Sequence, residues 1–145
     1  MAYIKELKVT FERKRVDDDL LKSPVESSTR VYELFGHLQD ETKEKVVVLH
    51  LNPQLEILSY EVSAIGTAHR ALIDPVEIYR NAMLARASVL IVVHNHPSGD
   101  PKPSEADKTS AAKLKQLGEI HGMKLQDFVI IGDGRYFSFS DEEII

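Results

Sequence analysis

The sequence predicts one α/β domain, built on a sheet with helices on both faces. Short β-branched, apolar runs at 46–50, 88–93 and 128–131 are typical of buried strands. Segments with helical periodicity alternate with these runs, which is the order that places helices on a sheet. The chain has 145 residues, the length of one domain, and can bury roughly two-thirds of its unfolded surface.

The first 45 residues contain a predicted strand and a predicted helix. Leu7, Val9 and Phe11 alternate with polar residues, so 3–16 has the pattern of a half-buried edge strand whose charges discourage pairing with other chains. After an acidic turn at 17–19, residues 27–38 are predicted to be helical. Their apolar face comprises Val31, Leu34, Phe35 and Leu38.

The central part is predicted to form a hairpin and then a helix. A Lys/Glu-rich linker leads to strands at 46–50 and 56–64, joined by a turn at Asn52-Pro53. Asp74-Pro75 opens the helix, because proline is favoured at the first helical position. The strand at 88–93 follows this helix.

The last third is predicted to contain a long helix and two strands. Prolines and Gly99 force residues 97–103 into a loop, and a helix then runs from Ser104 to about His121, ending at Gly122. A buried strand at 128–131, a turn at 132–134 and a short strand at 136–139 complete the expected fold.

A candidate metal site lies where the strand at 88–93 ends. The two-residue period of a strand puts His94 and His96 on one face, so both imidazoles can bind one ion. Ser104 and Asp107 have the spacing of a capping box, and a cap alone would leave Asp107 facing solvent. Ala111 and Leu114 follow it at helical spacing, which favours an inward carboxylate. We therefore expect His94, His96 and Asp107 to bind one zinc ion.

Two histidines and one carboxylate are the protein ligands of a catalytic zinc site, whose fourth position is left to water. Zinc lowers the pKa of such a water from its high value in bulk water towards roughly 7. A base must still take the proton. Since no glutamate lies inside the motif, the best candidate by pattern is Glu61, within the strand predicted at 56–64. Imidazole and carboxylate ligands also suit iron, nickel or cobalt.

These residues resemble a known signature. A glutamate ahead of Gly66-Thr67, then His-x-His-Pro, then Ser-x-x-Asp, is similar to the JAMM motif of JAB/MPN metalloproteases, and closest to the RadC branch. The similar stretches are Val93–Pro101, Pro103-Ser104 and Val129–Gly134 with Tyr136, within a resemblance that runs from about Val46 to Phe139.

The resemblance implies a JAB/MPN-like mixed sheet with cytidine-deaminase-like α-β-α layering. It implies that His94, His96 and Asp107 bind zinc and that Glu61 is the general acid and base. Ser104 would hydrogen-bond the zinc-bound water or the developing oxyanion, in competition with its capping role. Residues 1–145 would be one RadC-like domain with 1–45 diverging from the family. Nothing in 1–44 has the paired short helices of a helix-hairpin-helix module.

Three functions remain open at this point. The first is a zinc-dependent hydrolase of peptide or isopeptide amides in protein substrates, in which a glutamate assists attack by zinc-bound water. The second is a metal-dependent nuclease or DNA-repair-associated factor, suggested by the RadC association and by lysines around the motif helix at 102, 108, 113 and 115. Their interleaving with carboxylates and a net charge of -5 make this nucleic-acid footprint weak. The third is a non-catalytic, metal-containing interaction module.

The amino-acid composition limits the kinds of site and the cellular location that we expect. The chain has no cysteine, which excludes disulfides, thiolate zinc sites and the Cys-containing site of zinc nucleobase deaminases. It has no apolar run that could cross a bilayer and no signal-peptide core, so we expect a cytoplasmic protein without a membrane partner. Oligomeric state is not predicted. Surface or hydrogen-bonded roles are expected for the other histidines and turn roles for two loop residues: His37, His50, His69, His121, Ser98 and Asp100.

Overall fold

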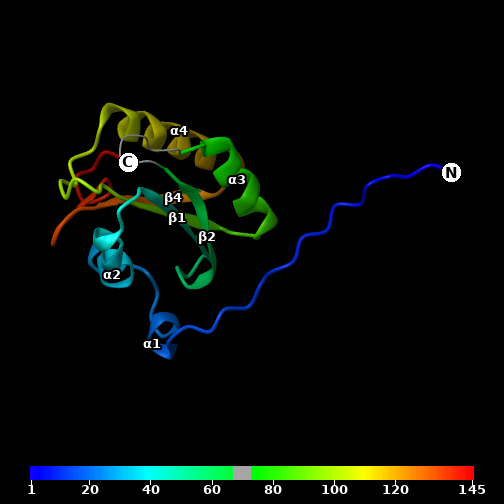
Figure 1. The fold of residues 1–145 in the computed structure, drawn as a ribbon, viewed down its shortest axis with the longest axis horizontal. Coiled ribbons are helices and arrows are strands. Elements are labelled where there is room, and N and C mark those ends of the chain that lie inside the picture. Colours follow the sequence, from blue (N-terminus) through cyan, green and yellow to red (C-terminus); the bar gives the residue numbers. More distant parts are fainter. Residues whose placement is uncertain (67–72) are drawn as a thin grey trace.

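The computed structural model describes residues 1–66 and 73–145, which form a five-stranded mixed sheet between two layers of helices (Figure 1). The spatial order is β2-β1-β3-β4-β5. Only β3 and β4 pair in parallel, and the other neighbours are antiparallel. The strands are β1 (Lys45–Leu51), β2 (Ile57–Ile65), β3 (Val89–Asn95), β4 (Lys124–Ile131) and β5 (Tyr136–Ser138). The predicted fold class is confirmed.

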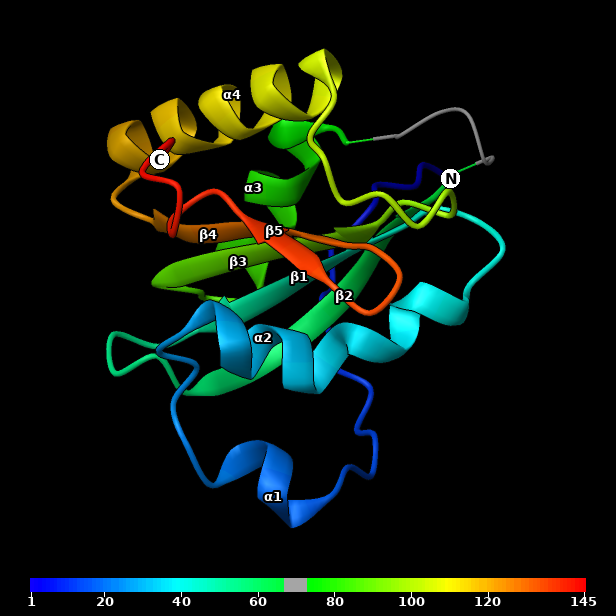
Figure 2. The ribbon, with the colours of Figure 1, turned by 90° about the vertical axis from the view of Figure 1, so that its left-hand side faces the viewer.

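The helices cover both faces of this sheet, as Figure 2 shows. Helices α3 and α4 pack on one face, and α2 with the 3₁₀ turn that follows it lies on the other. The helices are α1 (Asp18–Leu21), α2 (Ser28–Phe35), the 3₁₀ turn (Gly36–Asp40), α3 (Pro75–Leu84) and α4 (Glu105–His121). No helix within 1–66 or 73–145 has both the length and the apolar composition needed to span a bilayer.

The central strands are buried on both sides, which explains their unbroken apolar sequences. In β1, Val46 and Val48 pack towards α3 and α4, whereas Val47 and Leu49 pack towards α2. The same alternation runs through β3 and β4. These three strands therefore form a rigid platform whose ends position the side chains of the candidate site.

Local signals set the boundaries of the helices. Asp74 caps α3 by accepting hydrogen bonds from the Val76 and Glu77 amides, and Pro75 occupies the first helical position. Helix α4 ends at Gly122, whose φ of 68° lies in the left-handed region that favours glycine. The predicted hairpin, helices and final turn are confirmed; β4 begins at Lys124, four residues before the predicted start.

The predicted N-terminal strand is wrong for this structure. Residues 1–17 form no helix or strand, and residues 1–19 are exposed. The segment projects from the domain in Figure 1. Leu7 and Phe11 keep 81% and 64% of their surface exposed, because no neighbouring strand supplies the hydrogen bonds and apolar contacts that their alternation requires.

Candidate metal centre

The site forms where three elements of secondary structure meet. Strands β1 and β3 run antiparallel, so the start of β1 lies beside the end of β3, and Val46 pairs with His94. The loop at 97–103 then returns the chain so that α4 begins next to the same strand ends. Side chains from residues 44, 94, 96 and 107 are thereby brought together, although they are far apart in sequence.

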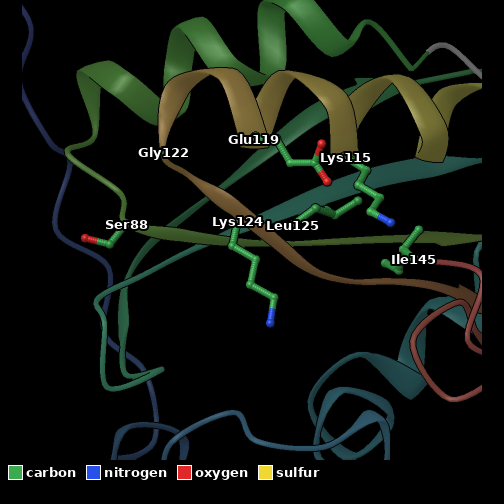
Figure 3. A pocket seen from close by; sticks show the side chains of 8 residues that line it. Ser88, Lys115, Glu119, Gly122, Lys124, Leu125 and Ile145 are labelled. Carbon is green, nitrogen blue, oxygen red and sulfur yellow. The ribbon is translucent and has the colours of Figure 1, made fainter.

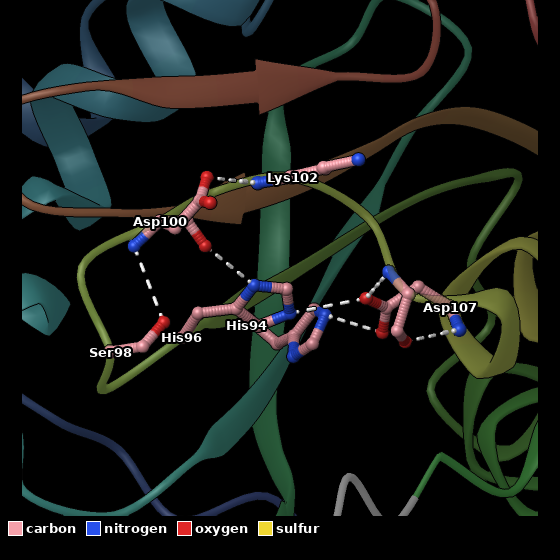
Figure 4. A network of polar contacts seen from close by, with 7 residues as sticks. His94, His96, Ser98, Asp100, Lys102 and Asp107 are labelled. Atoms are coloured by element: carbon pink, nitrogen blue, oxygen red, sulfur yellow. Dashed lines mark hydrogen bonds and ion pairs between the residues drawn. The ribbon is translucent and has the colours of Figure 1, made fainter.

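His94, His96 and Asp107 converge as their spacing predicted (Figure 4). The His94 Nε2 atom lies 3.0 Å from Asp107 Oδ1, and His96 Nε2 lies 3.1 Å from Asp107 Oδ2. His94 and Asp107 are fully buried, whereas the His96 side chain keeps 14% of its surface exposed. The cluster therefore opens to solvent on the His96 side.

Backbone contacts orient His96. Its Nδ1 lies 2.9 Å from the Asp100 carbonyl oxygen, and its amide donates to the Ile131 carbonyl oxygen. A carbonyl can only accept, so this contact assigns the hydrogen to Nδ1 and turns Nε2 towards Asp107. Such support of the second ring nitrogen is typical of metal-binding histidines. Gly99, at φ 87°, lets the loop fold back to make the contact.

Asp107 caps its helix and faces the histidines at the same time. Its Oδ2 accepts the Ser104 amide at 2.8 Å, while the Ser104 hydroxyl oxygen accepts the Asp107 amide at 3.1 Å. This is the predicted capping box. The Ser104 hydroxyl hydrogen is not used by the cap, so capping leaves a donor available.

Electrostatics favour an ionised Asp107. Burial alone would raise the pKa of this carboxyl, but contacts with His94, His96 and Ser104 hold it well below its usual range. For His96, burial acts to lower the pKa, and the hydrogen bond to Asp107 with the Asp100 contact raises it overall. The helix N-terminus further favours the anion.

Glu44, immediately before β1, is the fourth member of the cluster. Its ligand atom and those of His94 and His96 all lie within 4.8 Å of one another. The side chain is 8% exposed, and Oε2 has no hydrogen-bond partner among the described residues. Burial raises its pKa, an effect that His94 and His96 partly offset. A buried carboxylate beside two histidines can exchange a proton with a bound molecule.

Asn95 fixes the backbone on both sides of Glu44. Its Oδ1 accepts the Lys45 amide at 2.7 Å, and its Nδ2 donates to the Lys43 carbonyl oxygen at 3.1 Å. Asn95 is itself 1% exposed. The residue between the two histidines thus holds the chain segment that carries the glutamate.

The donor atoms fit a metal ion. Within the described part of the chain, His94 Nε2, Asp107 Oδ1 and Glu44 Oε2 are buried without a hydrogen bond of normal geometry, although the first two lie 3.0 Å apart. Buried polar atoms normally have partners. Ligands about 2.0–2.1 Å from a tetrahedral zinc ion lie about 3.3 Å from one another, close to the two contacts between histidine and aspartate. The cluster can therefore hold a metal ion.

Comparison with known proteins agrees with this arrangement. Residues 25–144 match the family described as the RadC-like JAB domain. The chain belongs to this family.

Curated relatives of the domain carry the name UPF0758 protein. The relative from Thermotoga maritima is 41% identical over 131 residues, which is 89% of this chain and 59% of the relative. Relatives from Methanosarcina mazei and Chlorobaculum tepidum are 38% and 44% identical, over 86% and 76% of this chain and 55% and 50% of their own length. The chain thus spans about half of the relatives it matches.

Glu61 does not join the metal centre of this RadC-like domain, so the structure does not support its expected role as base. It lies on β2, two strands from β3 and therefore about 10 Å across the sheet. Its Oε2 accepts a hydrogen bond from Asn81 at 2.9 Å. Sequence reasoning chose it because it lies in a clear strand pattern. Glu44 was missed because it stands in a charged run that resembles a linker.

Where the structure describes them, the other residues discussed in the sequence analysis form hydrogen bonds within loops or strands, or lie outside the metal centre. The Asp100 carboxylate accepts the Lys102 amide, and the Ser98 hydroxyl accepts the Asp100 amide, so both stabilise the loop (Figure 4). His50 is buried beside Ser59, at 2.8 Å from its hydroxyl. His37 and His121 are outside the cluster of ligand atoms described above. His69 lies outside the described residues.

A separate pocket of about 490 Å³ lies at the other end of α4 (Figure 3). Its lining residues are Ser88, Lys115, Gly118, Glu119, Gly122, Lys124, Leu125 and Ile145. None belongs to the metal centre of the RadC-like domain.

Proposed function

We propose that this domain is a zinc-dependent hydrolase of peptide or isopeptide amide bonds, with His94, His96 and Asp107 as the ligands of one zinc ion. The observation that carries the proposal is the convergence of Glu44 on these three residues. When bound, zinc would lower the pKa of water and polarise a substrate carbonyl. The family, the buried donor atoms and the partial exposure of His96 support it.

Glu44 replaces Glu61 as the proposed general base and acid. Its carboxylate accepts a proton from the attacking water and returns that proton to the leaving amine nitrogen as the C–N bond breaks. Burial raises its pKa, which makes the carboxylate a better proton acceptor than an exposed glutamate. Asn95 keeps the carboxylate in place through the backbone of Lys43 and Lys45.

Ser104 is proposed to donate its hydroxyl hydrogen to the developing oxyanion. The hydroxyl oxygen accepts the backbone amide of Asp107, one of the proposed ligands, and this bond leaves the hydroxyl hydrogen available to a bound molecule. The substrate is proposed to be a peptide or protein, encountered in the cytoplasm, whose carbonyl enters beside the partly exposed His96.

The test compares two conservative glutamate variants. Metal content of the purified protein is measured by mass spectrometry, and cleavage of a proteome-derived peptide library and of isopeptide-linked peptides is followed after zinc loading. We expect near-stoichiometric zinc in the wild type, in Glu44→Gln and in Glu61→Gln. We expect Glu44→Gln to cut the cleavage rate by about 10²–10⁴-fold, and Glu61→Gln to leave it unchanged within about twofold.

Two outcomes would overturn the proposal. If zinc-loaded wild-type protein cleaves neither class of amide, the non-catalytic interaction module becomes the preferred function. If cleavage is lost in Glu61→Gln but retained in Glu44→Gln, the assignment of the base is wrong. A His96→Ala variant of verified fold should lose the metal, which separates failure of the site from failure of the chemistry.

A further inference from the structure

The outer edge of β2 carries an apolar row that is not covered. β2 lies at the end of the sheet order, and among residues 1–66 and 73–145 it pairs only with β1. Leu58, Tyr60 and Val62 keep 50%, 43% and 48% of their surface exposed. Tyr60 and Val62 pair with Leu49 and Val47, so the row continues the sheet face that α2 covers further inward. An open edge beside exposed apolar residues is suited to strand addition.

The N-terminal segment carries a matching pattern. Leu7, Val9 and Phe11 are spaced by two residues and are exposed by 81%, 50% and 64%. Lys8 and Thr10, which alternate with them, would point to the opposite face of a strand. Within residues 1–66 and 73–145, neither this segment nor the outer edge of β2 has a strand partner.

We propose that residues 7–11 of a second copy of this chain add to the edge of β2 as an antiparallel strand. Pairing Leu7 with Val62 places the other two apolar residues of the segment opposite Tyr60 and Leu58. The same register places Lys8 opposite Glu61 and Thr10 opposite Ser59. Three apolar pairs on one face and two polar pairs on the other thus follow from one alignment.

Glu61 supplies a second, independent observation. Its Oε1 is buried and has no hydrogen-bond partner among the described residues, and Glu77 adds a nearby negative charge. An ammonium group from Lys8 would provide the missing partner and oppose both charges. A parallel alignment with the same ion pair would place Phe11 opposite Ala64 and leave Leu58 uncovered. The antiparallel register therefore satisfies more groups.

A second copy is the occupant that fits the structure. The same segment is present in the single chain, yet it projects away from the domain instead of lying on its own β2 edge (Figure 1). If two copies each donate their segment, the interface is reciprocal and two-fold symmetric, so assembly closes at a dimer. Each copy then covers one apolar row and loses one open edge.

The experiment measures the mass and dissociation constant of the full chain by light scattering and analytical ultracentrifugation. The wild type is expected to dimerise. Val9→Asp, Lys8→Glu and Glu61→Lys should each raise the dissociation constant by about tenfold or more, because every change occurs twice in a symmetric dimer. Lys14→Glu is the matched control, since it makes the same charge change outside the proposed pairs, and it should have no effect beyond twofold.

Charge exchange distinguishes pairing from loss of fold. The double variant Lys8→Glu with Glu61→Lys should restore dimerisation, because the ion pair is re-formed with its signs reversed. Val9 and Lys8 are exposed in the single chain, so substituting them leaves the domain intact. A monomeric wild type would overturn the proposal. So would amide protection of residues 7–11 in a monomer, which would identify each chain's own segment as the occupant, or a double variant no better than the single ones.

Discussion

Two regions on the same face of the sheet contain similar types of residue but differ in the contacts that their side chains make. The candidate metal centre contains Glu44, His94 and His96, with Asp107 in contact with both histidines. The β1–β2 region contains His50, Ser59, Glu61 and Asn81. In both, a buried histidine lies in the sheet and burial raises the pKa of a glutamate. In the metal centre Asp107 contacts both histidines, whereas His50 and Glu61 each contact a neutral side chain.

The difference shows that a shifted pKa does not by itself mark a catalytic site. His50 turns its Nδ1 to Ser59, and Glu61 accepts from Asn81, so each group has a neutral partner of its own. His50 Nε2 and Glu61 Oε1 are also buried without a hydrogen bond among the described residues, but they belong to two separate residue pairs. In the metal centre, Asp107 contacts both histidines, and unpaired buried atoms of His94, Asp107 and Glu44 belong to one cluster. Convergence of several ionisable groups on a shared point, rather than unpaired buried atoms alone, is the feature that distinguishes a site able to hold a metal ion.

The largest expected effect follows from Asp107→Asn. The amide keeps the size of the side chain but removes the charge that both histidines face. Zinc affinity should fall by more than the roughly 100-fold that loss of a supporting residue causes. Competition with a chromophoric chelator measures this affinity. Asp127→Asn is the control: this aspartate is also buried, but it bonds Ser138 and Ser140, and its variant should bind zinc like the wild type.

The next effect concerns pH and His50. Burial lowers the pKa of His50 from 6.5 to about 4, so the unfolded chain binds a proton that the folded domain excludes. The neutral His50 therefore costs the folded domain nothing above pH 6.5. As the pH falls from 6.5 towards 4, the free energy of unfolding decreases by about 3 kcal/mol.

Urea unfolding at several pH values measures this change. His50→Gln should be relatively more stable than the wild type at pH 4 than at pH 7, because glutamine does not titrate. Asp107 acts in another window: its pKa is depressed, so its contribution is lost only below its usual pKa of about 3.8. An identical pH dependence of the wild type and the variant between pH 4 and 7 would refute the role of His50.

A smaller effect is expected from Asn95→Ala. The variant leaves the Lys45 amide without its side-chain acceptor and frees the chain on both sides of Glu44. We expect a loss of about 2 kcal/mol in the free energy of unfolding, with zinc retained. If Glu44 acts as proposed, cleavage should slow at saturating substrate without a comparable change in KM. Cleavage at the wild-type rate would show that Asn95 does not position Glu44.

The smallest effect is expected from Asn81→Ala, in the β1–β2 region. Removing the amide breaks one hydrogen bond, to Glu61, and should cost about 1 kcal/mol of unfolding free energy. Zinc content and cleavage should match the wild type. Loss of either would mean that the two regions are coupled, and that Glu61 matters to the metal centre after all.

Much of the fold was predictable because its signals are local. The apolar run of β3, the proline and aspartate that begin α3, and the capping box of α4 each specify their element without distant contacts. The contact between His94, His96 and Asp107 was predictable for a related reason, since one strand, one loop and one helix connect them in order.

Glu44 and the N-terminal segment were not predictable by the same means. Glu44 reaches the site only because β1 pairs with β3, a contact between residues about 50 positions apart, and no local pattern reports such pairing. In the N-terminal segment, the alternation of Leu7, Val9 and Phe11 indicates a strand, but a strand exists only when a neighbour supplies hydrogen bonds. Both features depend on long-range strand pairing, which local sequence patterns do not specify.

The capping box at Ser104 and Asp107 also affects how much metal binding costs. The hydrogen bond from the Ser104 amide to Asp107 Oδ2 restricts the Asp107 side chain before any ion arrives, so less rotamer entropy remains to be lost on coordination. The helix cap thereby pre-orients Asp107 for metal binding. A cation bound to Asp107 would in turn stabilise the first turn of α4. Hydrogen exchange at the amides of Ser104 and Asp107 should therefore slow when zinc is added. The rigidity of the first turn of α4 and the occupancy of the metal centre would then be thermodynamically coupled.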